Sequence, residues 1–138
     1  MAASFPLLDT NPILRHILDD HSDHSPRAHT LFARIEDGEE RVRTTDTVIF
    51  EVAFTLERFY KVPRVEIRDT LLDLLQLPGI ALPGKRFYRQ VFDLWVQHPR
   101  LSFADCYHAV LVDRLKLPAI VTFDRDFDNL PNIKRREP

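Results

Sequence analysis

The sequence predicts an α/β fold, with three α/β/α layers built around a mostly parallel central sheet. Short apolar runs alternate along the chain with longer stretches in which apolar residues recur at helical spacing, a pattern typical of parallel sheets covered on both faces. The chain has 138 residues and is 44% hydrophobic, which is enough for a buried core. We therefore expect a single domain over residues 1–138, with residues 131–138 as a flexible tail.

The predicted elements follow one another without a linker or an internal repeat. The first strand covers residues 5–8 and ends at Asp9, and Asn11 with Pro12 has the pattern of a helix cap followed by a first helical residue. The other predicted elements are, in chain order, a helix from Ser25 to Gly38, a strand over residues 42–45, a helix capped by Asp46, a helix from Pro63 to Gly79, a strand over residues 80–82, a helix over residues 85–98, a helix from Ser102 to Lys116 and a strand over residues 119–123.

Composition excludes several classes of function. The net charge of −2 argues against non-specific duplex binding by bulk charge, although it is compatible with a local basic rim. Only three glycines are present, too few for a glycine-rich phosphate loop, so nucleotide-binding loops of that type are excluded. The single cysteine, Cys106, cannot form an internal disulfide, which fits a cytoplasmic location. We expect neither a membrane span nor a signal peptide.

Four acidic residues, far apart in the chain, each lie beside a short apolar run: Asp9, Glu51, Asp105 and Asp124. An acid beside the core costs stability unless it is paired, hydrogen-bonded or bound to a metal. Asp9 and Asp124 directly follow predicted strands, and ligands of α/β folds bind at the carboxyl ends of strands. If the runs belong to one sheet-based domain the carboxylates can converge, and their mutual repulsion then favours a cation between them.

Three of these acids also have a purely structural interpretation. Asp9 can be an ordinary turn or cap residue, and Glu51 can lie on a solvated helix face near the edge of an apolar stripe. Asp124 begins a turn-like polar cluster with Asp126 and Asp128, either of which can be a fifth ligand or merely solvated. The individual residues leave these alternatives open.

Asp105 has the strongest structural alternative. Ser102 and Asp105 have the spacing of a capping box, in which an acid three residues into the helix hydrogen-bonds back to the N-cap. The helix dipole also favours an acid at this end. Asp105 can therefore be explained without any catalytic role.

The four acids lie within four motifs that follow one another over essentially the whole chain. These are Leu8-Asp9-Thr10-Asn11 with Leu14, Glu51 with Leu56-Glu57-Arg58, Ser102-Phe103-Ala104-Asp105, and Thr122-Phe123-Asp124-Arg125-Asp126-Phe127. In this order they resemble the PIN-domain ribonucleases, and among them the VapC-like toxins of type II toxin–antitoxin modules. The resemblance implies that the four acids form the family's acidic site, that Asn11 and Thr122 assist it, and that Asp126 is a further candidate ligand.

The resemblance further implies a metal-dependent endoribonuclease, a hydrolase of RNA phosphodiesters that a small cognate antitoxin inhibits and that forms a homodimer. Oxygen ligands suit Mg²⁺ or Mn²⁺. We expect Asp9 and Asp105 as principal ligands, with Glu51 and Asp124 acting through water or orienting the nucleophile; the general base is not identified. Two alternatives remain, a stand-alone PIN nuclease of RNA processing and a non-catalytic interaction domain.

Two further surfaces are predicted. Lys85, Arg86 and Arg89, with Arg100 near the start of the Asp105 helix, can guide RNA phosphates toward the acids, or can be a solvated basic face. The predicted helices at residues 25–38 and 63–79 are amphipathic, and in this family such helices form a groove for an antitoxin segment. Their large apolar residues, Phe32, Leu71 and Leu75, can equally belong to the domain's own core.

Overall fold

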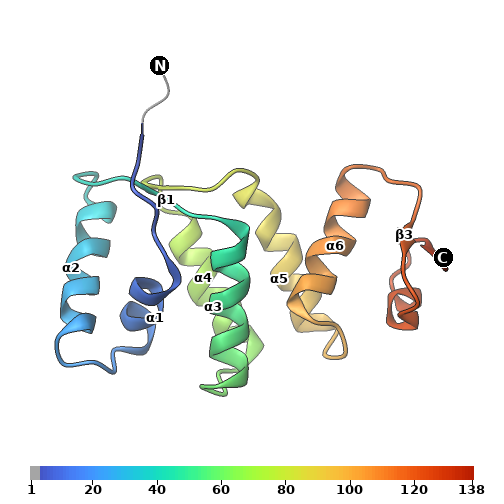
Figure 1. Cartoon of the computed structure of the whole chain (residues 1–138), viewed down its shortest axis with the longest axis horizontal. Helices are drawn as coiled ribbons and strands as arrows, with labels where there is room; N and C mark the ends of the chain where they lie inside the picture. Colours follow the sequence, from blue (N-terminus) through green and yellow to red (C-terminus); the bar gives the residue numbers. More distant parts are fainter. Residues whose placement is uncertain (1–3) are drawn as a thin grey trace. The chain divides into compact units, whose positions relative to one another are not determined.

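The computed structural model describes residues 4–138 and divides the chain into two units, Met1–Lys85 and Arg86–Pro138. Each unit consists of helices together with two short strands (Figure 1). The strand pairs within the units are parallel, as the predicted α/β fold requires. None of the helices in the described part of the chain is both long and apolar enough to cross a membrane.

From residue 4 onward, the first unit contains four α-helices and a small parallel sheet. β1 pairs with β2 in the register Val42↔Ile80, and Leu7 forms an isolated parallel bridge to Arg43 on the other side of β1. Residues 5–8 therefore lie beside β1 but form a single bridge in place of the predicted strand. The bounds of the elements are α1 Thr10–Leu18, α2 His24–Glu36, β1 Val42–Arg43, α3 Asp46–Arg58, α4 Arg64–Leu75 and β2 Ile80–Ala81.

Three helix starts in this unit differ from the prediction by one or two residues. α2 begins at His24, with Asp23 in the N-cap position, so Ser25 is not its start. α1 begins at Thr10, with extended backbone at Asp9 in the N-cap position, so Asn11 is not the cap. Thr45 and not Asp46 caps α3, because the Thr45 side chain accepts a hydrogen bond from the backbone of Val48. Pro12 still lies in the first turn of α1, where its missing N–H has no intrahelical partner to lose.

The core of the first unit lies beneath α1, α2 and α4. α1 packs against α2 (Figure 1), and Phe32, Leu71 and Leu75 are at most 5% exposed. Leu8, Ile13 and Ile49 line the same interior as these three side chains. Of the two predicted interpretations of these large apolar residues, an antitoxin groove or the domain's own core, the burial supports the core.

The second unit is built around a cluster of aromatic rings on α5 and α6. The Phe92 and Phe103 ring centroids lie 4.8 Å apart, and Trp95 packs edge-on against Phe103 at 5.2 Å. Tyr88 stacks on Phe103 with the ring centroids 6.3 Å apart and lies 6.2 Å from Phe92. The elements here are η1 Lys85–Phe87, which spans the boundary, α5 Tyr88–Gln97, α6 Phe103–Arg114, β3 Ile120–Val121, η2 Arg125–Asn129 and β4 Arg135–Arg136.

The C-terminal segment differs from the predicted flexible tail. β4 pairs with β3 in parallel, and the backbone N–H of Ile120 donates to the carbonyl of Lys134 at 2.8 Å. Arg135 also forms ion pairs with Asp128 at 2.9 Å and Glu137 at 3.1 Å. Residues 134–136, within the predicted flexible tail, therefore supply both backbone pairing and salt bridges.

Candidate acidic site

In the first unit, a hydrogen bond joins the start of α1 to the middle of α3. Thr10 is only 8% exposed, and its hydroxyl donates to Glu51 Oε2 at 2.7 Å. A hydrogen bond to a carboxylate is stronger than one between neutral groups, so this contact restrains the Glu51 side chain. Sequence analysis did not single out Thr10, although it follows Asp9 directly in the first motif.

Asp9 and Glu51 are both exposed, although each lies beside a short apolar run in the sequence. The Asp9 carboxylate makes no capping hydrogen bond to α1, although the residue occupies the N-cap position. The capping role that could have explained Asp9 is therefore absent from the described helix. Its side chain is left available to a ligand, next to the residue that restrains Glu51.

Asn11 lies in the first turn of α1 and is exposed. It lines a groove of about 310 Å³ between α1 and α2, whose rim includes Arg15 and Arg27. Leu31 contributes an apolar wall. Asn11 is thus placed near Asp9 in sequence and beside a groove with a basic rim.

In the second unit, Asp105 forms the predicted capping box. Its Oδ2 accepts from the backbone N–H of Ser102, and Ser102 Oγ accepts from the backbone N–H of Asp105, each at 3.1 Å. The structural role is therefore confirmed. Within residues 4–138, no hydrogen bond to Asp105 Oδ1 is made, so one carboxylate oxygen can serve a ligand while the other caps α6.

Asp105 and Thr122 line the same hollow, of about 380 Å³, between α6 and β3. Thr122 Oγ1 accepts a hydrogen bond from the backbone N–H of Asp124 at 3.1 Å, and Asp124 Oδ1 accepts from the backbone of Asp126 at 2.9 Å. Thr122 therefore holds the turn that presents Asp124, which is exposed. The assisting role that the family resemblance implies for Thr122 stays a prediction.

Asp126 is engaged by a basic residue. Arg100 Nε lies 3.6 Å from Asp126 Oδ1, and the Arg100 side chain is 84% exposed. An ion pair this exposed contributes little stability. Arg100 thus remains able to reach a phosphate, while Asp126 is more simply explained as its partner than as a ligand.

The remaining predicted RNA-contacting residues fall into two groups. The Lys85 ammonium donates to the carbonyls of Leu77 at 3.1 Å and Ile80 at 2.8 Å, and burial lowers the pKa of Lys85. Its environment is that of a structural residue. Arg86 and Arg89 are exposed on the second unit.

Arg114 joins Arg86 around one aromatic ring, which sequence analysis did not foresee. The guanidinium carbons of Arg86 and Arg114 lie 5.4 Å and 5.2 Å from the Phe87 ring centroid. Such contacts hold a cation in place over an aromatic face. The chain separation between Arg86 and Arg114 left no signal of this pairing in the sequence.

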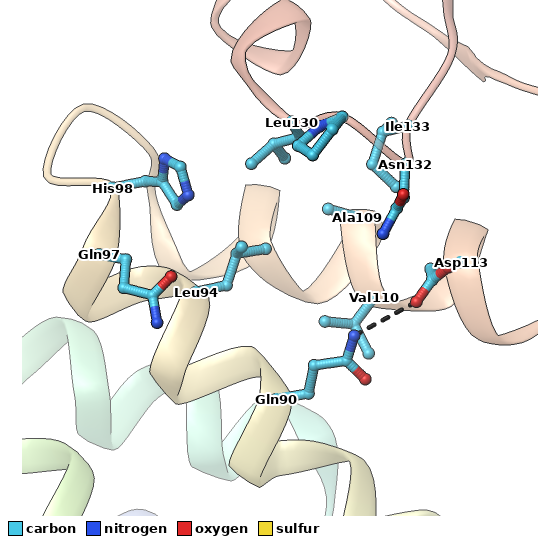
Figure 2. Close-up of a pocket in the computed structure, with 11 residues that line it drawn as sticks. Gln90, Leu94, Gln97, His98, Ala109, Val110, Asp113, Leu130, Asn132 and Ile133 are labelled. Atoms are coloured by element: carbon cyan, nitrogen blue, oxygen red, sulfur yellow. Dashed lines mark hydrogen bonds between the residues drawn. The ribbon is translucent and has the colours of Figure 1, made fainter.

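A separate pocket of about 250 Å³ lies between α5, α6 and the segment after η2 (Figure 2). Gln90 donates to Asp113 at 3.3 Å at one end of it, and Arg114 donates to Gln90 at 2.8 Å. His98 lies toward the other end of the view, and Asn132 also lines the pocket (Figure 2). None of the four acids lines this pocket.

The donors available to a cation are carboxylates, two in each unit. Asp9 and Glu51 belong to the first unit, and Asp105 and Asp124 to the second. In the part of the chain described here, no group of three or more histidine, cysteine, aspartate or glutamate side chains is gathered closely enough to hold a metal ion. The donor chemistry itself suits hard cations such as Mg²⁺ and Mn²⁺, which prefer oxygen ligands.

Comparison with known families identifies the fold to which these residues belong. The chain matches the PIN domain over residues 7–133, a range that includes all four acids and most of both units. The chain belongs to the PIN-domain family. It is also 25% identical over 124 residues, 90% of each chain, to a protein named VapC ribonuclease from Aquifex aeolicus (strain VF5). The predicted family and α/β fold class are therefore confirmed.

Proposed function

We propose that this PIN domain is a metal-dependent endoribonuclease and the toxin of a toxin–antitoxin module. The observation that carries the proposal is the presence of Asp9, Glu51, Asp105 and Asp124 in a PIN-family chain, each with a carboxylate accessible to a ligand. The relative named VapC ribonuclease, aligned over 90% of both chains, supports RNA as substrate. We propose that the four acids serve one reaction.

Asp9 and Asp105 would be the principal residues that hold Mg²⁺ or Mn²⁺, with Glu51 and Asp124 in supporting positions. Such an ion supplies charge neutralisation at the phosphodiester and activates water for hydrolysis. The chain's own contribution is to orient its acids. The Thr10 hydroxyl fixes one oxygen of Glu51, and the Ser102 backbone N–H fixes one oxygen of Asp105.

Arginine residues of the second unit are proposed to bind the RNA backbone. Arg86 and Arg114 are held over Phe87, Arg89 is exposed nearby in sequence, and Arg100 projects into solvent beside Asp126. Contacts to phosphate give affinity without sequence preference and weaken as salt rises. The contacts that Lys85 makes with two carbonyls favour a structural role for it instead.

The groove between α1 and α2 is the proposed contact for a small antitoxin. Its apolar lining from Ala28 and Leu31 and its basic rim from Arg15 and Arg27 fit an amphipathic helix with acidic residues beside its apolar face. This replaces the predicted groove of large apolar residues, which are buried in the core. The proposal of a homodimer remains a prediction.

The deciding experiment measures cleavage of single-stranded RNA by purified protein. We expect cleavage with Mg²⁺ or Mn²⁺, loss of cleavage in excess chelator, and at least a hundredfold loss in Asp9→Asn and Glu51→Gln. Asp73→Asn, which alters an exposed acid of α4, is the matched control and should cleave within about twofold of the wild type. Equal activity with and without chelator, or in Asp9→Asn, would refute the metal-dependent reaction.

A second experiment separates a toxin from a stand-alone processing nuclease. Expression of the wild type should arrest growth, expression of Asp9→Asn should not, and co-expression of the small protein encoded beside the gene should restore growth. Cleavage in vitro without growth arrest would favour RNA processing. Neither cleavage nor arrest would favour a non-catalytic interaction domain, for which the capping role of Asp105 is the supporting observation.

A further inference from the structure

Two histidines connect α1 to α2 in a way that the proposed nuclease reaction does not use. His16 Nδ1 and His29 Nδ1 lie 2.6 Å apart, and the two rings meet edge to face with centroids 4.8 Å apart. His29 Nε2 lies 2.8 Å from Asp19 Oδ1, and His16 stacks on the buried Phe32 ring at 4.2 Å. These contacts therefore connect Asp19 at the end of α1 to His29 on α2, and His29 to His16 on α1.

The number of protons on the two imidazole rings determines whether the hydrogen bond between them can form. A hydrogen bond between two Nδ1 atoms contains one proton, so one ring donates and the other accepts. In the neutral pair His29 donates from Nε2 to Asp19, which makes His29 Nδ1 the acceptor and His16 Nδ1 the donor. A first added proton can bind to His16 Nε2 while the shared proton moves to His29 Nδ1, so that His29 carries the positive charge and donates to both Asp19 and His16. A second proton places N–H groups face to face and breaks the bond.

The charged groups near His29 differ from those near His16. Asp19 is the carboxylate on the His29 side, and it partly offsets a positive charge there. Arg15, also on α1, is engaged by Asp20 at 2.7 Å and by the Tyr60 hydroxyl that follows α3, at 3.2 Å. Burial, followed by the neighbouring His29, lowers the pKa of His16 below its ordinary value of 6.5, while Asp19 acts in the opposite direction.

We propose that His16 and His29 form a pH-sensitive clasp, which holds α1 against α2 at neutral pH and releases them on acidification. The clasp tolerates one added proton and fails with the second, so the transition belongs to the pair and not to one residue. α1 and α2 also form the walls of the groove beside Asn11, so release changes the shape of that surface. The inference stands whether or not the chain cleaves RNA.

The direction of the pH effect follows from linkage. The pKa of His16 is lower in the folded state than in the unfolded state. The folded state therefore binds fewer protons than the unfolded state as the pH falls below 6.5. The stability from the neutral ring is therefore complete above pH 6.5 and is lost as pH falls toward the lowered pKa. One such group changes the unfolding equilibrium constant by up to about tenfold per pH unit in this window.

The test is urea denaturation of the full chain between pH 5 and pH 8. His16→Phe keeps a flat ring on Phe32 but cannot take up a proton, so it should lose less stability on acidification than the wild type, by up to about tenfold in the unfolding constant per pH unit below 6.5. His24→Gln removes an exposed histidine from α2 and should follow the wild type. A pH dependence of His16→Phe that parallels the wild type would overturn the clasp.

A spectroscopic measurement on the wild type keeps the proposal testable if His16→Phe fails to fold. Nitrogen chemical shifts of the imidazole rings distinguish Nδ1–H from Nε2–H forms. We expect His16 in the Nδ1–H form above pH 7, which isolated neutral histidine does not favour, with His29 in the Nε2–H form. Two ordinary Nε2–H rings that titrate independently would refute it.

Discussion

Two conservative substitutions, at Ser102 and at Asp105, can distinguish the contribution of the α6 cap to stability from the contribution of Asp105 to the proposed acidic site. Ser102→Ala removes the acceptor for the Asp105 backbone N–H at 3.1 Å but leaves the Asp105 charge in place. Asp105→Asn removes the charge but keeps a side-chain oxygen that can accept from the Ser102 backbone N–H. One change therefore affects the helix end, and the other affects the ability to hold a cation.

The expected magnitudes differ between stability and activity. Replacing an N-cap serine by alanine costs about 1 kcal/mol, which for a chain of this size corresponds to a fall of roughly 3–5 °C in melting temperature. Loss of a negative charge in the first helical turn costs about 0.3–1 kcal/mol. If Asp105 repels the other acids in the metal-free protein, its neutralisation offsets this cost. RNA cleavage should fall at least a hundredfold in Asp105→Asn and stay within about threefold in Ser102→Ala.

Thermal melts and RNA cleavage, each measured with Mg²⁺ and with chelator, provide the assay. The wild type and Ser102→Ala should both gain stability from Mg²⁺, whereas Asp105→Asn should gain less. The reasoning is refuted if Asp105→Asn is destabilised equally with and without Mg²⁺ and still cleaves RNA. Asp105 would then be a helix cap alone, and the nuclease assignment would lose one of its principal ligands.

Three other outcomes are expected. Thr10→Val should lower the free energy of unfolding by about 1 kcal/mol in urea titrations, because a hydrogen bond to a carboxylate is lost. The same substitution should reduce RNA cleavage, and unchanged cleavage would contradict a role of Thr10 in orienting Glu51. Mg²⁺ at a hundred times its Kd should stabilise the wild type by about 2.7 kcal/mol, and Glu51→Gln by less. If calorimetry shows the same gain for both proteins, Glu51 does not contribute to Mg²⁺ binding. Lys85→Met should destabilise the protein by about 1–3 kcal/mol, because the carbonyls of Leu77 and Ile80 lose their donor. RNA affinity measured by fluorescence anisotropy should stay near that of the wild type. A loss of RNA affinity without a loss of stability would indicate that Lys85 contacts RNA.

Helix ends with local signals were predicted well from sequence. The Ser102 cap with its box, the end of α2 before Gly38 at φ 81°, and the start of α4 after Pro63 all depend on residues within one turn of the boundary. The predicted cap at Asn11 was wrong, because proline is tolerated anywhere in the first turn and does not mark its first residue. Residues 5–8 and 134–136 were misjudged because strand pairing depends on a distant partner.

Side-chain partners across the chain could not be predicted in the same way. Thr10 lies 41 residues from Glu51, and no local pattern connects a buried threonine with an exposed glutamate. His16 and His29 are 13 residues apart, and their contact requires the particular rotation of α1 against α2. The pairing of Arg86 and Arg114 around Phe87 depends in the same way on how η1 packs beside α6.

The sequence by itself predicted the family and the fold class, which the comparisons confirm, and it indicated the capping box of α6 and the four candidate acids, because these depend on residue type and short-range spacing. Only the tertiary structure decided how those residues are used. It showed that Thr10 restrains Glu51, that His16 contacts His29, and that Phe32 is core. The physical reason is that a side chain's hydrogen-bond partner and its burial are set by elements that meet only after the chain has folded.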